Sequence, residues 1–442
     1  MAEIFPFEAY RYNLERVRLD DVVTQPYDKI TPRMQERYTA ASPYNLIAVE
    51  KGQPSPNDSA SDNVYTRAEK ALEDWIRQGV LARDARAGIY VYFQDYAVPG
   101  TTERRTRKGF IALGRLEDYA AQVVFRHEQT LSGPKADRLE LLRHTRTHTG
   151  QLFMLYSDPR RRIDALIEEV AARSLPAEAR DEFDVVHRLW PVFDAPIIEE
   201  IVRAMSAQKL VIADGHHRYE TALAYRDERR KKSGSLGRDA PYEKSMMTFF
   251  NTQGAGLLIL PTHRLVRNLK SFDVASFRQR VDSIFEAEDY AFGGEAARGV
   301  VYERFRRDLL AGEQNERVLG MYAGGEFTLL RLRRDADLAK LMPEVAPAQR
   351  QLDVVLLHRI LLENSLGITP AAVTAEQNIV YEREMDAALN AVDQERAQIA
   401  FLLNPVGVTQ VVDMALAGEV LPQKSTDFYP KLLSGLTLYR FD

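Results

Sequence analysis

The sequence predicts a mixed α/β protein with two domains, and three observations lead to this expectation. The chain has 442 residues, which exceeds the roughly 100 to 200 residues of an ordinary single domain. Hydrophobic residues make up 45% and charged residues 28%, enough for sizeable cores under a charged surface. Segments with helical and strand periodicity alternate without a regular repeat. We place the domain boundary near residue 268, which gives an N-terminal domain over 1–268 and a C-terminal domain over 269–442.

In the first half, apolar spacing predicts helices that alternate with strands. The β-rich runs 89–93 and 108–114 flank a polar turn, so we expect an antiparallel pair. Trp75 lies on the apolar face of a predicted helix and is expected in the core. The helices of this half are expected over 64–79, which contains Trp75, and over 135–144, 160–180 and 197–205. Further strands are expected over 152–156, 185–192, 210–213 and 256–260.

The second half mixes the same two kinds of element. Helices are expected over 274–285 and 352–364, and strands over 327–330 and 400–403. The chain then ends in an extended tail.

Composition excludes several classes of function. With no cysteine there is no disulfide, no thiolate nucleophile and no cysteine-type zinc site, so any metal must bind oxygen or imidazole. The N-terminus lacks the pattern of a signal peptide, and no stretch reaches the ~18 apolar residues of a membrane span. We therefore expect a cytoplasmic protein without a membrane partner. The formal charge of -5 lacks the basic excess of a nucleic-acid binder, so no nucleic acid is expected.

The strongest motif is the run Asp214-Gly215-His216-His217-Arg218, which stands between a predicted strand and a predicted helix. The first backbone N–H groups of a helix are unpaired and its dipole is positive there, so an anion fits this position. Gly215 lets the backbone approach a phosphate closely. Both imidazoles and the Arg218 guanidinium can donate to phosphate oxygens, and Asp214 can cap the helix or help to hold Mg²⁺. The run predicts a phosphate-handling enzyme.

Two other interpretations of this run remain open. A helix can begin with a polar cap whose histidines are merely solvated or satisfied in the interior. The adjacent histidines also suggest a transition metal, but neighbouring side chains point in different directions and one pair supplies too few ligands for zinc.

A second cluster is Arg126-His127-Glu128-Gln129-Thr130, followed by Lys135 and Asp137-Arg138 at the head of a predicted helix. Glu128 beside His127 could take a proton from a hydroxyl, and Lys135 and Arg138 could neutralise phosphate charge. The alternative is a charged surface loop before a charged helix. A third cluster, Lys424-Ser425-Thr426, combines a lysine with small hydroxyls that can hold a phosphate, although the same residues are ordinary turn formers.

These clusters together resemble the bacterial family known as domain of unknown function 1015, and the resemblance runs nearly end to end. That family is similar to the free serine kinases of archaea and, through them, to the ParB and sulfiredoxin fold. The resemblance implies a ParB/sulfiredoxin-like N-terminal core with insertions and a second α/β domain that completes the site. It rests on His127-Glu128-Gln129-Thr130, Asp137-Arg138 and the segments 213–219, 260–264 and 422–431.

The resemblance implies phosphorylation of free L-serine to O-phospho-L-serine, with ADP, ATP or pyrophosphate as the donor. By analogy Glu128 is the base on the substrate hydroxyl, and the turn 215–218 grips the phosphates. The long C-terminal half, which the small archaeal kinases lack, leaves both donor and acceptor open.

Our working hypothesis is a Mg²⁺-dependent small-molecule kinase, in which each candidate residue has a role. The candidate catalytic residues are Glu128, His127, Asp214 and His217; the candidate phosphate ligands are Gly215, His216, His217, Arg218, Lys135, Arg138, Lys424, Ser425 and Thr426; the candidate metal ligands are Asp214 and Asp137. The alternatives are a ParB-like nucleotide-binding regulatory or DNA-associated protein and a phosphatase that uses water as the acceptor. The expected partners are small-molecule substrates, and a homodimer is left open.

Overall fold

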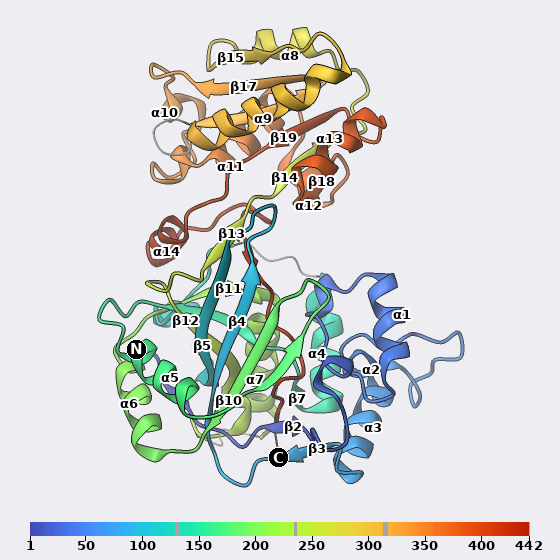
Figure 1. The fold of residues 1–442 in the computed structure, drawn as a ribbon, viewed down its shortest axis with the longest axis vertical. Helices are drawn as coiled ribbons and strands as arrows, with labels where there is room; N and C mark the ends of the chain where they lie inside the picture. Colours follow the sequence, from blue (N-terminus) through green and yellow to red (C-terminus); the bar gives the residue numbers. More distant parts are fainter. Residues whose placement is uncertain (129–132, 234–236, 313–316, 442) are drawn as a thin grey trace. The chain divides into compact units, whose positions relative to one another are not determined.

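The computed structural model describes residues 1–128, 133–233, 237–312 and 317–441. The chain forms two compact units, the first of Met1–Leu258 with Phe428–Asp442 and the second of Ile259–Asp427. In Figure 1 the red C-terminal segment runs back among the blue and green elements of the first unit. The division that we predicted at residue 268 therefore misses this return of the chain, because periodicity is local and does not show which distant segments pack together.

A sheet of nine strands forms the centre of the first unit. Its order is β6-β11-β8-β12-β5-β4-β10-β9, with β1 paired to β5. β4 and β5 pair antiparallel, as their sequences predict, whereas β6 runs parallel to β11 and β8 parallel to β12. The strands are β1 Ile4–Phe5, β4 Ile89–Ala97, β5 Arg104–Arg115, β6 Val124–Phe125, β8 Leu152–Tyr156, β9 Ala177–Arg180, β10 Val186–Val192, β11 Leu210–Asp214 and β12 Lys244–Asn251.

Helices and short strands complete the first unit. The helices are α1 Pro32–Ala41, α2 Ile47–Glu50, α3 Val64–Arg77, α4 Gly133–Thr145, α5 Arg162–Arg173, α6 Ala195–Met205 and α7 His216–Ser233, and the short strands include β2 Tyr10–Tyr12, β3 Leu81–Arg83, β7 Thr147–His148 and β21 Tyr439–Arg440. A capping box of Asn63 and Thr66 starts α3, and Trp75 on this helix is buried as predicted. One helix prediction is wrong: residues 177–180 form β9, because Pro176 cannot continue α5.

The second unit has its own sheet and core. Six strands pair antiparallel in the order β15-β17-β16-β19-β14-β18. They are β14 His263–Val266, β15 Phe285–Tyr290, β16 Val318–Ala323, β17 Glu326–Leu332, β18 Ile379–Glu382 and β19 Ile399–Leu402. The helices are α8 Val274–Val281, α9 Glu295–Gly312, α10 Leu338–Leu341, α11 Asp353–Leu356, α12 Pro370–Thr374, α13 Met385–Asp393 and α14 Val408–Leu416, with a π-helix over Leu357–Ser365.

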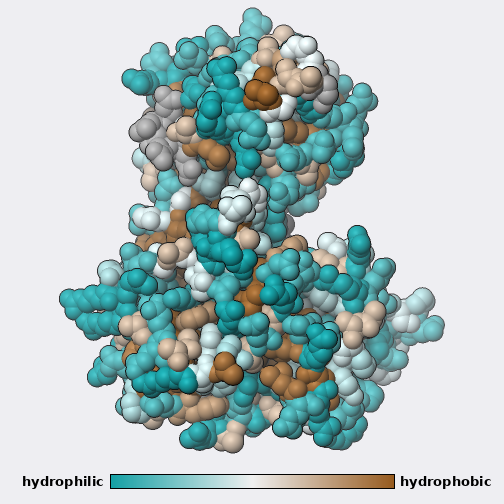
Figure 2. Space-filling view, viewed as in Figure 1, coloured by the Kyte–Doolittle hydropathy of each residue, from teal (hydrophilic) through white to brown (hydrophobic). Residues whose placement is uncertain are grey.

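The mixed α/β class is confirmed in both units. The predicted helix over 274–285 is shorter than expected, since β15 begins at Phe285. None of the helices that the structure describes combines the length and apolar character that a bilayer crossing requires. Hydrophilic side chains cover most of the face shown in Figure 2, in keeping with a chain in which 28% of residues are charged.

Phe110 provides a test of the first core. Its side chain is fully buried on β5 and stacks on Phe249, with ring centroids 5.1 Å apart. We expect Phe110→Ala to lower the free energy of unfolding by about 3–5 kcal/mol, because truncation leaves a cavity. Phe183, which is 54% exposed, is the control, and its replacement by Ala should change stability by no more than about 0.5 kcal/mol. Both tryptophans, Trp75 and Trp190, lie in the first unit, so their fluorescence during urea unfolding reports this core; equal effects of the two variants would contradict the assignment.

Candidate functional site

The parallel pair β6 and β11 brings two of the predicted clusters together. Val124 lies opposite Leu210 and Phe125 opposite Val211. Since parallel strands run in the same direction, the chain leaves both at the same edge of the sheet. His127 and Glu128 follow β6 at this edge, and the turn that begins α7 follows β11. The alignment of these two loops is thus a consequence of strand pairing.

The first residues after each strand are in contact. The rings of His127 and His216 meet edge to face with centroids 4.8 Å apart. The His127 backbone N–H donates a long hydrogen bond of 3.5 Å to Nε2 of His216, and His127 Nδ1 lies 2.7 Å from the Ile212 carbonyl oxygen. A carbonyl only accepts, so we assign the imidazole proton of His127 to Nδ1.

Both imidazoles are uncharged near neutral pH. Burial lowers the pKa of His127 to about 4. Burial, followed by the neighbouring His127, lowers the pKa of His216 well below its ordinary value. The pair therefore brings no positive charge to the site, and the Nε2 atom of His216 is already an acceptor. This fits a role in positioning the turn, while phosphate binding by His216 stays a prediction.

Gly215 occupies a backbone position that other residues adopt with strain. Its φ of +93° lies in the left-handed region, and an added Cβ would approach Leu152 Cδ2 to 3.1 Å and Arg218 Nε to 3.2 Å. The carbonyl of Gly215 accepts from the Tyr219 N–H at 2.9 Å, which closes the first turn of α7. The first N–H groups of an α-helix point along its axis, so an anion can bind where α7 begins.

Asp214 is surrounded by cations. Arg218 Nη2 lies 3.5 Å and Lys431 Nζ 3.7 Å from the same Asp214 oxygen, Oδ2. Burial alone would raise the pKa of Asp214, but the charges of Lys431, Arg218 and Lys29 outweigh it and hold the pKa well below its usual range. The carboxylate therefore stays ionised throughout the neutral range. Arg218 also donates to the Gln151 carbonyl, which fixes its guanidinium beside the turn.

A small cavity adjoins Arg218. Its volume of about 50 Å³ has room for roughly three or four water molecules. Arg138 borders it too: its Nη1 donates to the Glu50 backbone oxygen at 2.8 Å, and its guanidinium lies 4.4 Å from the centre of the Tyr27 ring. The polar residues that line the cavity are Tyr27, Glu50, Arg138, Thr147, His148, Thr149, Arg218, Thr221 and Ser245.

One known protein family matches most of this chain. The family model described as "Protein of unknown function (DUF1015)" matches residues 4–355. The chain belongs to this family. No curated protein matches it.

Several solved structures are similar to this DUF1015 protein over most of their length. A conserved hypothetical protein from Pyrococcus furiosus shares 12% identity, with a TM-score of 0.32 over 71% of this chain and 92% of its own. A free serine kinase in complex with AMP shares 11%, with a TM-score of 0.34 over 71% and 89%. SbnI with a C-terminal truncation, from Staphylococcus aureus, shares 11%, with a TM-score of 0.34 over 74% and 87%. These likenesses are too distant to carry an activity over.

The remaining predicted residues of the DUF1015 protein lie in different surroundings. Lys135 forms an ion pair with Glu220 of α7, which keeps it near this helix. Glu128 and His217 are half-buried, and the His217 carbonyl accepts from Thr221 Oγ1 at 2.7 Å. The catalytic roles proposed for Glu128 and His217 stay predictions. Gln129 and Thr130 lie outside the described residues.

The third predicted cluster belongs to the second unit. Lys424 is exposed, and Ser425 is buried with its hydroxyl donating to the Pro422 carbonyl at 2.5 Å. Thr426 is half-buried. The participation of these three residues in phosphate binding stays a prediction.

The sequence analysis included Lys431 in the segment 422–431 but gave no role to this lysine, which lies beside Asp214. Its side chain is 9% exposed, and its carbonyl accepts from Gln94 Nε2 at 2.8 Å. A usable signal was present: the tail contains Leu432, Leu433, Leu436 and Leu438, all of which are buried. An apolar tail must pack against a core, and a lysine within it is then drawn in as well.

Magnesium remains a prediction for the DUF1015 protein. The described residues contain no group of three or more His, Asp or Glu side chains that could hold a metal ion. Asp137 is half exposed and bonds to Arg138 and to the Tyr65 hydroxyl. The roles of Asp214 and Asp137 as Mg²⁺ ligands stay predictions.

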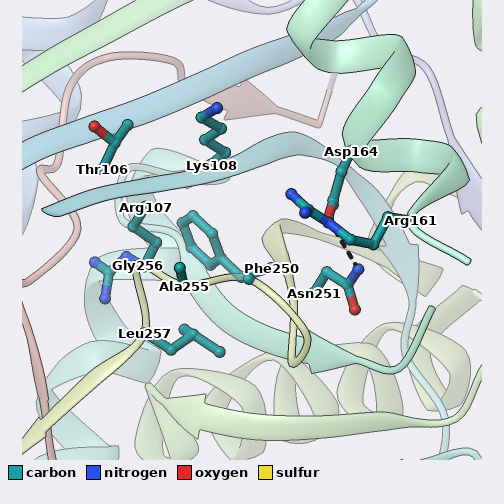
Figure 3. Close-up of a pocket in the computed structure, with 11 residues that line it drawn as sticks. Thr106, Arg107, Lys108, Arg161, Asp164, Phe250, Asn251, Ala255, Gly256 and Leu257 are labelled. Carbon is teal, nitrogen blue, oxygen red and sulfur yellow. Dashed lines mark hydrogen bonds and ion pairs between the residues drawn. The ribbon is translucent and has the colours of Figure 1, made fainter. Parts of the chain in front are cut away.

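A larger cavity of about 230 Å³ lies elsewhere in the first unit (Figure 3). Arg107 and Lys108 are consecutive on β5 and point to opposite sides of the strand in this view. Lys108 pairs with Glu168 at 2.9 Å, and the Asp164 carboxylate accepts from Arg161 at 3.0 Å and from Asn251 at 3.1 Å. These polar groups satisfy one another, and none of the predicted site residues lines this cavity.

The buried histidine pair predicts a pH dependence of stability. The pKa of His127 is about 4 in the folded protein and about 6.5 in an unfolded chain. Between these values the unfolded chain binds a proton that the folded one does not, so stability falls as the pH drops, by about 1.4 kcal/mol per pH unit. Above about pH 6.5 His127 is neutral in both states, so the stability that is lost at lower pH is fully present there.

The variant His127→Asn tests this origin, because its amide nitrogen can still donate to the Ile212 carbonyl. Urea unfolding should show a slope with pH that is shallower than that of the wild type by about 1.4 kcal/mol per unit between about pH 4 and 6.5. Above about pH 7 the two slopes should coincide, which serves as the internal control. Identical slopes at low pH would contradict the assignment.

Proposed function

We propose that this protein is a small-molecule kinase that transfers a phosphoryl group to the hydroxyl of free L-serine and so forms O-phospho-L-serine. The observation that carries the proposal is the contact between the two loops at one sheet edge. The rings of His127 and His216 lie 4.8 Å apart, so His127 contacts the first turn of α7. Glu128 is the next residue in the chain. In the proposal, the Glu128 carboxylate acts beside the anion site of this turn, which is the combination that transfer to a hydroxyl needs.

In the proposed reaction, the α7 turn binds the phosphate that is transferred. Its backbone N–H groups and the Arg218 guanidinium donate to the phosphate oxygens, and Gly215 permits the close approach. The bond between the serine oxygen and phosphorus forms as the bond from phosphorus to the donor's bridging oxygen breaks. Glu128 takes the hydroxyl proton. The rest of the donor, a nucleotide or inorganic phosphate, leaves with the bridging oxygen.

The cavity beside Arg218 suits a small acceptor. A volume of about 50 Å³ matches a ligand of a few non-hydrogen atoms. Arg138 and Arg218 can bind a carboxylate, and the buried Glu50 can accept from an ammonium group. These are the charged groups of an amino acid, which supports serine over a sugar.

The donor is proposed to be ADP, ATP or pyrophosphate with Mg²⁺. The ion would neutralise charge on the donor phosphates, and Asp214 is the carboxylate at the turn that could help to hold it. His127 and His216 contribute position, since both are uncharged.

The direct test of the function supplies purified protein and Mg²⁺ with L-serine and, in separate tubes, ATP, ADP or pyrophosphate. We expect O-phosphoserine, detected by mass spectrometry, in at least one tube. L-Alanine, which lacks the hydroxyl, is the control acceptor and should give no phosphorylated product. Release of phosphate that does not depend on serine would instead indicate a phosphatase, and the absence of product with every donor would count against serine as the acceptor.

Glu128→Gln tests the proposed base. It keeps the size of the side chain but removes its basicity, so turnover should fall by roughly 10²- to 10⁴-fold while donor affinity is retained. Glu36→Gln, at an exposed position of α1, is the matched control and should retain full activity. A fully active Glu128→Gln variant would rule out this base.

A further inference from the structure

The last residues of the chain are built into the first unit. We call residues 428–441 the terminal strap. Its backbone is bonded to several strands and loops of this unit: Gln151 Nε2 donates to the Leu433 carbonyl, Thr24 and Ser434 exchange two hydrogen bonds, and Tyr10 and Leu438 exchange two more. The side chain of Arg107 donates to the carbonyls of Tyr429 and Pro430.

The position of Lys431 follows from these attachments. Gln94 and Gln151 hold the backbone at this residue and two residues further on, through the carbonyls of Lys431 and Leu433. At the start of the strap, the Phe428 ring packs against His127, with centroids 6.1 Å apart, and against Phe153 at 5.3 Å. The strap thus runs along the edge at which the α7 turn begins.

Two cationic side chains from distant parts of the chain meet at Asp214. Lys431 and Arg218 share one oxygen of this carboxylate at 3.7 and 3.5 Å, and Lys29 adds its charge from nearby. Both distances exceed the roughly 2.7–2.9 Å of a charged hydrogen bond. The positive end of α7 lies at the same point, so the two cations and the first turn of this helix can act on one anion.

We propose that Lys431 of the terminal strap and Arg218 of α7 together bind the phosphate that is transferred, with Asp214 orienting both cations. This inference rests on the proposed function, because it takes the α7 turn as the phosphate site. The two cations suit this ligand differently. Arginine presents a planar fork to two oxygens, and lysine is a compact charge that can follow a phosphoryl group during transfer. The lysine that completes the donor site is Lys431, seven positions beyond the predicted Lys424.

The test compares four full-length proteins. Lys431→Met keeps the length and apolar stem of the side chain but removes its charge, and Lys431→Arg keeps the charge. Lys232→Met, at an exposed position in the last turn of α7, is the matched control. Pyrophosphate and ADP binding is measured by calorimetry, and KM for the donor and kcat by the phosphoserine assay.

We expect Lys431→Met to weaken pyrophosphate binding by about 10- to 100-fold, the loss of one charged hydrogen bond. Lys431→Arg should recover most of the affinity, and Lys232→Met should match the wild type. A merely structural role would lower the unfolding temperature without this recovery by arginine. If Lys431→Met folds poorly, Lys431→Gln carries the same expectation with a polar end to the side chain.

The outcomes separate the two proposals. Wild-type pyrophosphate binding that is unchanged in folded Lys431→Met overturns the role of Lys431, whatever the acceptor is. Binding that is lost in Lys431→Met, in a protein that makes no phosphoserine, supports Lys431 and overturns serine as the acceptor. A wild type that binds neither pyrophosphate nor ADP, and that makes no phosphoserine with any of the three donors, overturns both.

Discussion

The parallel pairing of β6 with β11 is the constraint on which the site depends. It fixes the direction and register of two short strands, so that the residues leaving Phe125 and Asp214 emerge side by side. The contact of His127 with His216 and the hydrogen bond of His127 to Ile212 then tie the two loops together. A slip of the register by one residue would turn every side chain of the moved strand to the other face, which would separate these groups. Strand pairing, more than any single site residue, creates the juxtaposition.

Burial acts in opposite ways on the two sides of the turn. On one side it keeps His127 and His216 neutral, because no anion close to them is strong enough to offset desolvation. On the other side Asp214 stays ionised, since Lys431 and Arg218 more than offset the same effect. The neutral side chains of His127 and His216 thus lie on one side of the turn, and the charged side chains around Asp214 lie on the other. Phosphoryl transfer, the reaction that we propose, asks a protein mainly for position and electrostatic stabilisation.

How well the sequence predicts a feature depends on how far apart in the chain the interacting residues are. The strand, turn and helix around Asp214 were predictable because periodicity and the Gly215 turn are local features. The burial of Trp75 was predictable for the same reason. Lys431 was not singled out, because its place beside Asp214 depends on a contact between segments more than 200 residues apart in the chain. The false extension of helix α5 across Pro176 shows that a local rule can also be overlooked when charged residues continue a helical pattern.

The return of the strap to the first unit costs conformational entropy of loop closure, and burial of its apolar side chains opposes this cost. The second unit joins Leu258 to Phe428, so placing the strap closes a loop of roughly 170 residues, at a cost of about 4–5 kcal/mol for a flexible chain. Folding of the second unit by itself shortens the effective loop and lowers this cost. Burial of the four leucines between Leu432 and Leu438 contributes about 6–12 kcal/mol at ~1.5–3 kcal/mol each. Burial of the apolar side chains of the strap is therefore large enough to offset the closure of this loop. The first unit is complete only when the final residues of the chain have been added, and with them the cation that lies beside Asp214.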